Sequence, residues 1–261
     1  MDQHKTELWW KFLMAVASFN LMAWGVIYWL FNGVEDPQGY NQKHLLLSGL
    51  YTLGCAFRSF WPRIDLERYC LVDSMVSSMV FGRTAATVAE ISFGLQMMYF
   101  LQEMGTHAQL PWVNAQAPWV VVSLTLAQCF CWSSVVSLSH WGHWIEESIW
   151  GLTFLYIGGV IGMCLPTLEG EWVWIGYIGG VTCAVYVAFM GWIDVPMYYR
   201  RWQIGRAENK MFLGAKEGFK DALFRREVTR DWAIWKKEMI WLTGYFAGAV
   251  WVSILLVFLP R

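Results

Sequence analysis

The sequence predicts an all-α, polytopic membrane protein with seven transmembrane helices, a cytoplasmic N-terminus and an outside C-terminus. The prediction depends on the composition, on the lengths of the apolar segments and on where Lys and Arg lie. Hydrophobic residues make up 57% of the 261 residues and charged residues only 15%, whereas a soluble domain carries about 25% charged residues. One soluble core cannot bury this excess, so we expect a multi-pass integral protein of a plasma, inner or organelle membrane.

A helix needs about 20 mostly apolar residues to cross roughly 30 Å of hydrocarbon. Seven segments meet or approach this length: Leu8–Phe31, His44–Trp61, Thr84–Leu101, Ala117–Ser139, Ile145–Leu165, Trp172–Trp192 and Glu238–Leu259. The second segment is the shortest and contains Arg58, so the alternative count is six spans, with this segment in the membrane interface. The first segment lacks a small-residue cleavage site and is interpreted as a retained span rather than a secretory signal.

The positions of Lys and Arg give the predicted orientation, because cytoplasmic loops of membrane proteins are enriched in both. With residues 194–237 placed in the cytoplasm, all but two of the 19 Lys and Arg residues lie inside, the exceptions being Lys43 and Arg261. The 19 Trp residues are also typical of a membrane protein, since tryptophan gathers at both interfaces. The chain is therefore predicted to be one transmembrane domain, residues 1–261, with a basic cytoplasmic insertion at about residues 194–237.

The predicted insertion mixes basic with aromatic residues. This mixture favours amphipathic helices that lie on the anionic inner leaflet. A helical connector solvated by ordinary charge pairs is the alternative. A second amphipathic run, Tyr69–Gly82, predicts an interfacial or re-entrant helix before the third span.

Ionisable side chains inside spans are costly and are therefore candidates for function. The predicted catalytic residues are such groups in the cytoplasmic half of the spans: Glu90, His140, Asp194, Arg58 and Arg83. Glu90 follows Arg83 by seven positions on the same helix face, roughly 10 Å deeper in the membrane. Two interpretations of Glu90 are open: a buried ion pair with Arg83 or Arg58 that fixes helix register, or a proton carrier or catalytic acid/base.

The densest chemical cluster is the sequence SHWGHWIEE at residues 139–147. On one helix, His140, His143 and Glu147 would share a face and could bind Zn or Fe. An expected tight turn at residues 141–144 argues against a continuous helix, and capping and solvation at the interface are the alternative. His140 is accordingly predicted as a second proton-transfer group or as a metal ligand.

The fourth predicted span supplies further polar residues on the way to His140. Gln128, Trp132 and Ser133 are the predicted substrate-binding residues. Cys129 and Cys131 are two positions apart, so their thiols diverge on a helix, and both are interpreted as core packing.

Several ligands and partners are not expected. The sequence contains no Walker loop or GxGxxG motif, so no nucleotide cofactor is predicted. The last span contains no Lys, which excludes a retinal Schiff base there. A net charge of −1 gives no global field for a nucleic-acid partner.

The expected partners are membrane lipids and a hydrophobic small molecule. Small residues four positions apart let two helices approach closely in lipid. Such Gly-x3-Gly pairs occur in the last three spans, at Gly158 and Gly162, Gly176 and Gly180, and Gly244 and Gly248. They predict close packing of these spans with one another, or a homo-oligomer.

The leading functional hypothesis is a membrane-embedded enzyme that acts on a lipid or isoprenoid-like substrate from the inner-leaflet side. Glu90 and His140 would transfer protons, and Arg58 and Arg83 would stabilise charge, with a metal ion as an optional component. The second hypothesis is a proton-coupled transporter or channel with Glu90 as the proton carrier. The third is a structural or pigment-binding subunit of a larger membrane complex.

Overall fold

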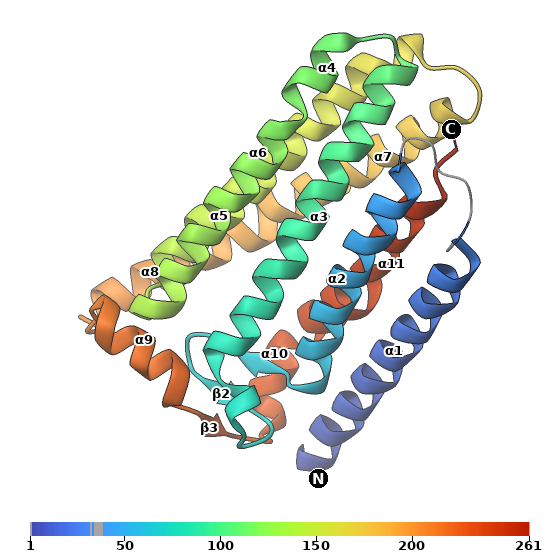
Figure 1. Ribbon diagram of the computed structural model, residues 1–261. Helices are drawn as coiled ribbons and strands as arrows, with labels where there is room; N and C mark the ends of the chain where they lie inside the picture. Colours follow the sequence, from blue (N-terminus) through green and yellow to red (C-terminus); the bar gives the residue numbers. More distant parts are fainter. Residues whose placement is uncertain (1, 32, 34–38, 261) are drawn as a thin grey trace. The chain divides into compact units, whose positions relative to one another are not determined.

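The computed structural model describes residues 2–31, 33 and 39–260, without the side chain of Asp2, so Arg261 lies outside the described residues. The described chain is mostly helical, as predicted. The α-helices are α1 (Asp2–Phe31), α2 (Tyr40–Phe60), α3 (Met79–His107), α4 (Pro111–Gln116), α5 (Pro118–Ser137), α6 (His140–Cys164), α7 (Glu171–Phe189), α8 (Val195–Ala207), α9 (Ala215–Phe224), α10 (Trp232–Thr243) and α11 (Ala249–Leu255) (Figure 1). The shorter elements are the 3-10 helices η1 (Met75–Ser77), η2 (Leu165–Thr167) and η5 (Leu256–Phe258), the π-helices η3 (Met190–Asp194) and η4 (Gly244–Gly248), and the two-residue strands β1 (Arg63–Ile64), β2 (Tyr69–Cys70) and β3 (Glu227–Val228).

Each of the seven apolar segments coincides with one helix or with a run of consecutive helices. Five of these helical segments are long and apolar enough to cross a membrane: Gln3–Phe31, Pro111–Ser137, His140–Thr167, Glu171–Ala207 and Trp232–Phe258. Large apolar side chains remain exposed along them, for example Leu8 at 62% and Trp29 at 75% on α1. Such exposure suits contact with lipid, so the structure is that of a membrane protein.

The chain divides into two compact units. The first comprises Met1–Gln96 and Lys216–Leu259, and the second comprises Met97–Ala215 with the last two residues. Helix α3 runs through the boundary at Gln96 and contributes to both units.

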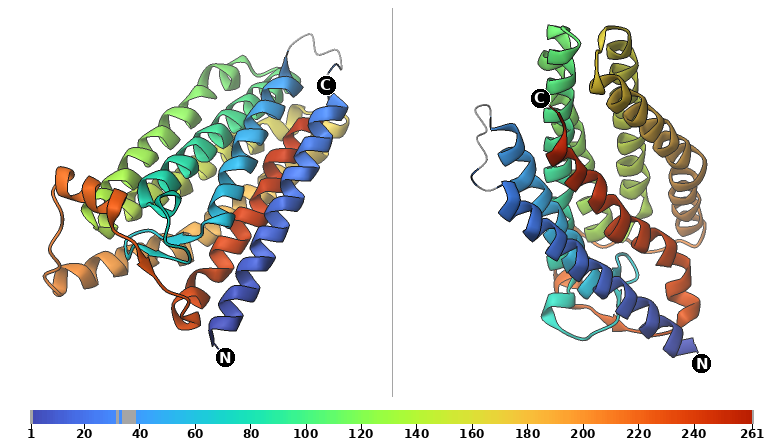
Figure 2. Two further views of the ribbon diagram at one scale, coloured as in Figure 1. Left: turned by 60° about the horizontal axis from the view of Figure 1, so that its bottom comes forward. Right: turned by 90° about the vertical axis from the view of Figure 1, so that its right-hand side faces the viewer.

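In the first unit, α1, α2 and the α10–α11 segment pack side by side around Trp9, Tyr51 and Trp235 (Figure 2). The beginning of α1 is attached to the end of the basic segment. Oγ1 of Thr6 donates a hydrogen bond to the Arg230 carbonyl at 3.0 Å, and Glu7 forms a 2.7 Å ion pair with Arg230. The N-terminal end of α1 therefore lies beside Arg230, near the end of the basic segment (residues 194–237).

The expected interfacial helix over Tyr69–Gly82 is not continuous: Tyr69–Cys70 form strand β2, Met75–Ser77 form η1, and the last residues, from Met79, begin α3. β2 pairs antiparallel with β1 and parallel with β3. Ser74 then caps η1 by accepting a hydrogen bond from the Ser77 amide at 3.2 Å. The amphipathic pattern was misleading because this segment obtains its backbone partners from a distant part of the chain.

In the second unit, α5 and α6 lie side by side, and α6 also packs on α7 and α8. The chain turns at Leu138, whose φ of 60° is left-handed, and Ser139 caps α6 by accepting from the Trp141 amide at 3.3 Å. The prediction of a tight turn at residues 141–144 is therefore wrong. Gly142 lies inside α6, where a Cβ atom would collide with the Phe130 carbonyl of α5, so the glycine serves a close helix contact.

The helix of the sixth predicted span, Trp172–Trp192, does not end at Asp194. Helix α7 continues through the π-helix η3 into α8, so the helical segment runs unbroken over Glu171–Ala207. The beginning of the expected insertion thus packs on α6. Trp202 of α8 stacks on Trp144 of α6, with ring centroids 5.6 Å apart and planes at 9°.

Close approach at glycine is seen between α6 and α7. A Cβ atom on Gly158 would lie 3.1 Å from Cβ of Cys183, and one on Gly176 would lie 2.8 Å from Leu165. In contrast, Gly244 and Gly248 have open space around their Cα positions.

Candidate functional site

The polar residues singled out from the sequence form two groups, one in each unit. The first group contains the predicted residues Arg58, Arg83 and Glu90, and lies on α2 and α3. The second contains His140, His143, Glu147 and Asp194, together with the predicted substrate-binding residues of α5.

Glu90 forms an ion pair with Arg83 within α3. Nη2 of Arg83 lies 2.6 Å from Oε1 of Glu90, and both side chains are buried. The predicted pairing of Glu90 with Arg83 is therefore present. Such a pair compensates the carboxylate charge in an apolar surrounding, and its role in register or in catalysis stays a prediction.

Arg58 has a different acidic partner. Its Nη2 lies 3.1 Å from Oδ1 of Asp65, and its guanidinium lies over the Phe246 ring at 5.5 Å. Asp65 follows α2 by only a few residues, so a short return of the chain after Pro62 supplies this partner. Nε and Nη1 of Arg58 are buried and donate no hydrogen bond to any described residue.

Two further buried arginines lie near the strands of the first unit. Arg68 pairs with Asp221 at 2.8 Å. Arg63 is only 2% exposed and donates through Nη2 to the Val76 carbonyl at 3.0 Å, while its Nε and Nη1 have no partner among the described residues. Burial, and then the charge of Arg58, lower the pKa of the Arg63 guanidinium. Its charged form would therefore gain from an added anion.

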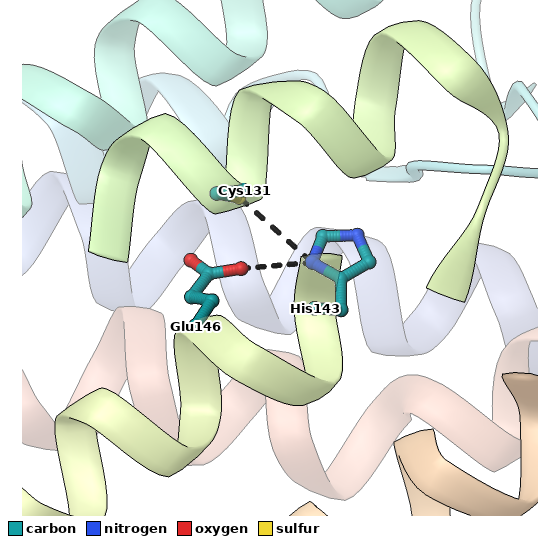
Figure 3. Close-up of side chains that lie close together, drawn as sticks. All are labelled: Cys131, His143 and Glu146. Carbon is teal, nitrogen blue, oxygen red and sulfur yellow. Dashed lines mark hydrogen bonds and ion pairs between the residues drawn. The ribbon is translucent and has the colours of Figure 1, made fainter. Parts of the chain in front are cut away.

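In the second unit, Cys131, His143 and Glu146 converge (Figure 3). Nδ1 of His143 lies 2.8 Å from Oε2 of Glu146 and 3.8 Å from Sγ of Cys131. Cys131 comes from α5, whereas His143 and Glu146 lie one turn apart on α6. All three residues are buried.

The side chain of Ser134 holds the main chain of His143 in place. Oγ of Ser134 accepts a hydrogen bond from the His143 amide at 2.6 Å and donates to the Ser139 carbonyl at 2.5 Å. The close approach at Gly142 brings the first turn of α6 onto this hydroxyl. The first turn of a helix has free amide groups, and here one of them is satisfied by the neighbouring helix.

Asp194, Glu147 and His140 surround this cluster. The Asp194 side chain is hydrogen-bonded to Glu147 and feels the charges of Glu146 and His143. Tyr198, one turn beyond Asp194 on α8, places its ring centroid 5.2 Å from that of His143 and 6.1 Å from that of His140.

Two atoms of this group are buried without a partner. Oδ2 of Asp194 and Nδ1 of His140 make no hydrogen bond to any described residue. A buried polar atom left unpaired costs about 1–3 kcal/mol. Structures that retain such atoms often do so for a ligand or for catalysis.

The structure rearranges the predicted metal set. Glu147 contacts Asp194, and the carboxylate beside His143 belongs to Glu146 instead. Cys131, interpreted as core packing, joins this cluster, while Cys129 is exposed, so the predicted divergence of the two thiols is confirmed. His140 lies 6.4 Å from His143, centroid to centroid.

The predicted substrate-binding residues are divided between faces of α5. Gln128 is buried one turn from Cys131, Trp132 is partly exposed, and Ser133 is exposed. The serine that contacts α6 is Ser134. Gln128, Cys131 and Ser134 recur at a spacing of three, which is a polar helix face that the sequence could have revealed.

The arrangement offers proton donors and acceptors in a buried setting, together with a set of sulfur, nitrogen and oxygen ligands. Comparison of the chain with protein-family models, with curated proteins and with solved structures finds no match.

Proposed function

We propose that this protein is an integral membrane enzyme that modifies a lipid or isoprenoid-like substrate at an acid/base site in its second unit. One observation carries the proposal: Asp194 and His140 present buried, unpartnered polar atoms beside the His143–Glu146 pair. Asp194 and His140 are the proton-transfer groups. General acid/base groups of this kind contribute about 10²–10⁴-fold to a rate.

An apolar groove on α5 and α6 supports an elongated hydrophobic substrate. It is lined mainly by apolar and aromatic side chains, among them Trp119, Ile149, Leu152 and Tyr156. On α6, Ile149 lies one turn beyond Glu146, so the groove begins one helical turn from the site. We propose that a lipid chain lies in this groove with its reactive end toward Glu146.

The proposed topology has seven spans, with the N-terminus inside and the C-terminus outside. Helices α2 and α3 complete the count beyond the five helical segments that qualify by composition. Their charged and polar side chains, such as Arg58, Glu90 and Gln96, are buried inside the unit, so average composition understates how apolar their outer faces are. The end that carries the strands and Arg230 is the cytoplasmic end, because the basic residues collect there.

Membrane lipids are proposed partners at this cytoplasmic end. A small pocket there is lined by Arg63, Arg68 and Arg225 together with Ser77 and Tyr69. Guanidinium groups recognise phosphate through paired N–H donors. Anionic headgroups of the inner leaflet therefore suit this pocket.

The enzyme proposal is tested with protein reconstituted in nanodiscs made from a total membrane lipid extract. Lipids are compared by mass spectrometry before and after incubation with wild type, Asp194→Asn and the control Glu169→Gln, which changes an exposed acid of the same unit. We expect new lipid masses with wild type and control, and about 100-fold slower formation with Asp194→Asn. Equal lipid profiles for all three proteins and for empty nanodiscs would reject the proposal.

A proton-coupled transporter is the second candidate, favoured by a buried polar track in the first unit. Six positions beyond Glu90 on α3, Nε2 of Gln96 donates to the Ser253 carbonyl at 3.0 Å and lies 3.3 Å from Nδ1 of His44. A pH jump across proteoliposomes, followed by an enclosed pH dye, separates the two functions. Proton flux that Glu90→Gln abolishes would support the transporter.

A further inference from the structure

The cluster of Cys131, His143 and Glu146 has the composition of a metal site. Their ligand atoms all lie within 4.8 Å of one another, which is the spacing of groups that share one ion. The set offers one sulfur, one nitrogen and one oxygen donor. Zn²⁺ accepts all three donor types, whereas non-haem iron sites with open positions use two His and one carboxylate.

The charges of the three ligands would match a divalent cation. A cysteine binds a metal as the thiolate, so Cys131 and Glu146 would bring two negative charges to the ion. An imidazole ligand adds no charge, so the two positive charges of the ion would be balanced.

The surrounding structure orients the ligands. His143 is fixed by the Ser134 hydrogen bond to its amide, and Glu146 lies one turn further on the same helix. Gly142 allows α6 to approach α5 closely enough for Cys131 to reach both. A site built between two rigid helices needs little rearrangement to bind an ion.

We propose that Cys131, His143 and Glu146 bind one Zn²⁺ ion. A catalytic role for this ion rests on the proposed enzyme function. Three protein ligands leave a fourth tetrahedral position open, as in catalytic rather than structural zinc sites. Asp194 interacts electrostatically with Glu146 and His143, so a zinc ion held by this set would supply a bound water or substrate oxygen from which Asp194 could take a proton.

The test measures metal content in the full-length protein. Wild type, Cys131→Ser and Cys129→Ser are purified in detergent, stripped with a chelator, incubated with Zn²⁺ and desalted. Cys129 is the matched control, since it lies on the same helix but is exposed. We expect about one zinc per chain for wild type and Cys129→Ser. Cys131→Ser should bind more weakly by at least the roughly 10–100-fold that follows loss of an outer-shell partner.

Cobalt substitution of wild type provides a measurement that does not depend on a variant's folding. Co²⁺ bound through a thiolate gives a near-ultraviolet charge-transfer band, which we expect in wild type and Cys129→Ser. Size-exclusion profiles and tryptophan fluorescence show whether Cys131→Ser remains folded. Wild type that retains no zinc and shows no such band would overturn the inference, as would equal zinc content in the two folded Cys variants.

The inference and the proposed function fail in different ways. Zinc retained without any change in the lipids would leave the metal site standing and reject the enzyme. Lipid modification that is undiminished after chelation would leave the enzyme standing and reject the metal. Activity that is lost on chelation and restored by Zn²⁺ supports both.

Discussion

Arg68 and Asp221 are separated by 153 positions, yet Nε of Arg68 lies 2.8 Å from Oδ2 of Asp221. The main chains of these two segments are also hydrogen-bonded: the Glu227 amide donates to the Arg68 carbonyl at 2.9 Å. Helix α9 is thereby attached to the segment that links α2 to α3. This contact holds the second half of the basic segment, residues 216–237, to the rest of the first unit.

Asp221→Asn should therefore destabilise the protein. The side chain of Arg68 is fully buried, while that of Asp221 is 15% exposed. Loss of one partner leaves a buried charge uncompensated, which costs about 3–5 kcal/mol, and the partial exposure places the effect at the lower end. Denaturant unfolding in mixed micelles measures it. Glu217→Gln on the exposed face of α9 is the control, and an equal effect of the two variants would contradict the prediction.

The Arg83–Glu90 pair predicts a double-variant result that separates its two interpretations. Glu90→Gln alone should destabilise the protein by about 3 kcal/mol, since Arg83 is then buried without its carboxylate. Arg83→Gln combined with Glu90→Gln should recover most of this loss. If the double variant is stable and keeps full lipid modification and any proton flux, the pair fixes helix register. If it is stable but has lost one of these activities, the pair takes part in that activity.

Gln96 links three helices of the first unit. A second substitution should restore part of the stability that is lost when Gln96 is replaced. It bonds the His44 carbonyl of α2 at 3.3 Å, the Ser253 carbonyl of α11 and the Ser253 hydroxyl. Gln96→Leu should cost about 1–2 kcal/mol, because the hydroxyl is left unpaired. Adding Ser253→Ala should restore part of the stability. No recovery in unfolding measurements of the double variant would show that the hydroxyl is not the source of the loss.

Gly142→Ala should disrupt the contact between α5 and α6. A Cβ atom there would lie 2.7 Å from Oγ of Ser134 and would also collide with the Phe130 carbonyl. We expect a loss of about 1–3 kcal/mol, as for other overpacked sites, together with weaker zinc retention. Gly159→Ala on the same helix has open space and should change neither. Thermal unfolding and metal content of the two variants give the comparison.

The helices of the seven apolar segments were predictable from the sequence because each segment is a long apolar run, and this signal is local. The Arg83–Glu90 pair was predictable for the same reason, since both residues lie on one helix two turns apart. The partners of Arg58 and Arg68 were harder to foresee. Asp65 depends on a strand turn and Asp221 on a contact across the sequence, and neither leaves a periodic signal.

The candidate site was only partly predictable. Asp194 was identified as a costly ionisable residue and His143 as a possible metal ligand, but the choice of Glu146 over Glu147 depends on how α6 faces α5. That angle is set by Gly142 and Ser134, whose roles appear only when two helices are packed. Cys131 was missed because a single buried thiol is usually part of a core.

Around the π-helix η3, the number of residues in the chain is as important for the site as the identity of the side chains. Its wide turn closes with the Val195 amide bonded to the Met190 carbonyl, five positions back, and so holds one residue more than an α-helical turn. Deleting one residue of this turn would therefore leave an ordinary α-helical turn and keep the direction in which α8 faces. Deleting Met197 from α8 itself would instead rotate the residues that follow by about 100° around the helix axis. Tyr198 and Trp202 would then leave His143 and Trp144, although no functional side chain had been replaced.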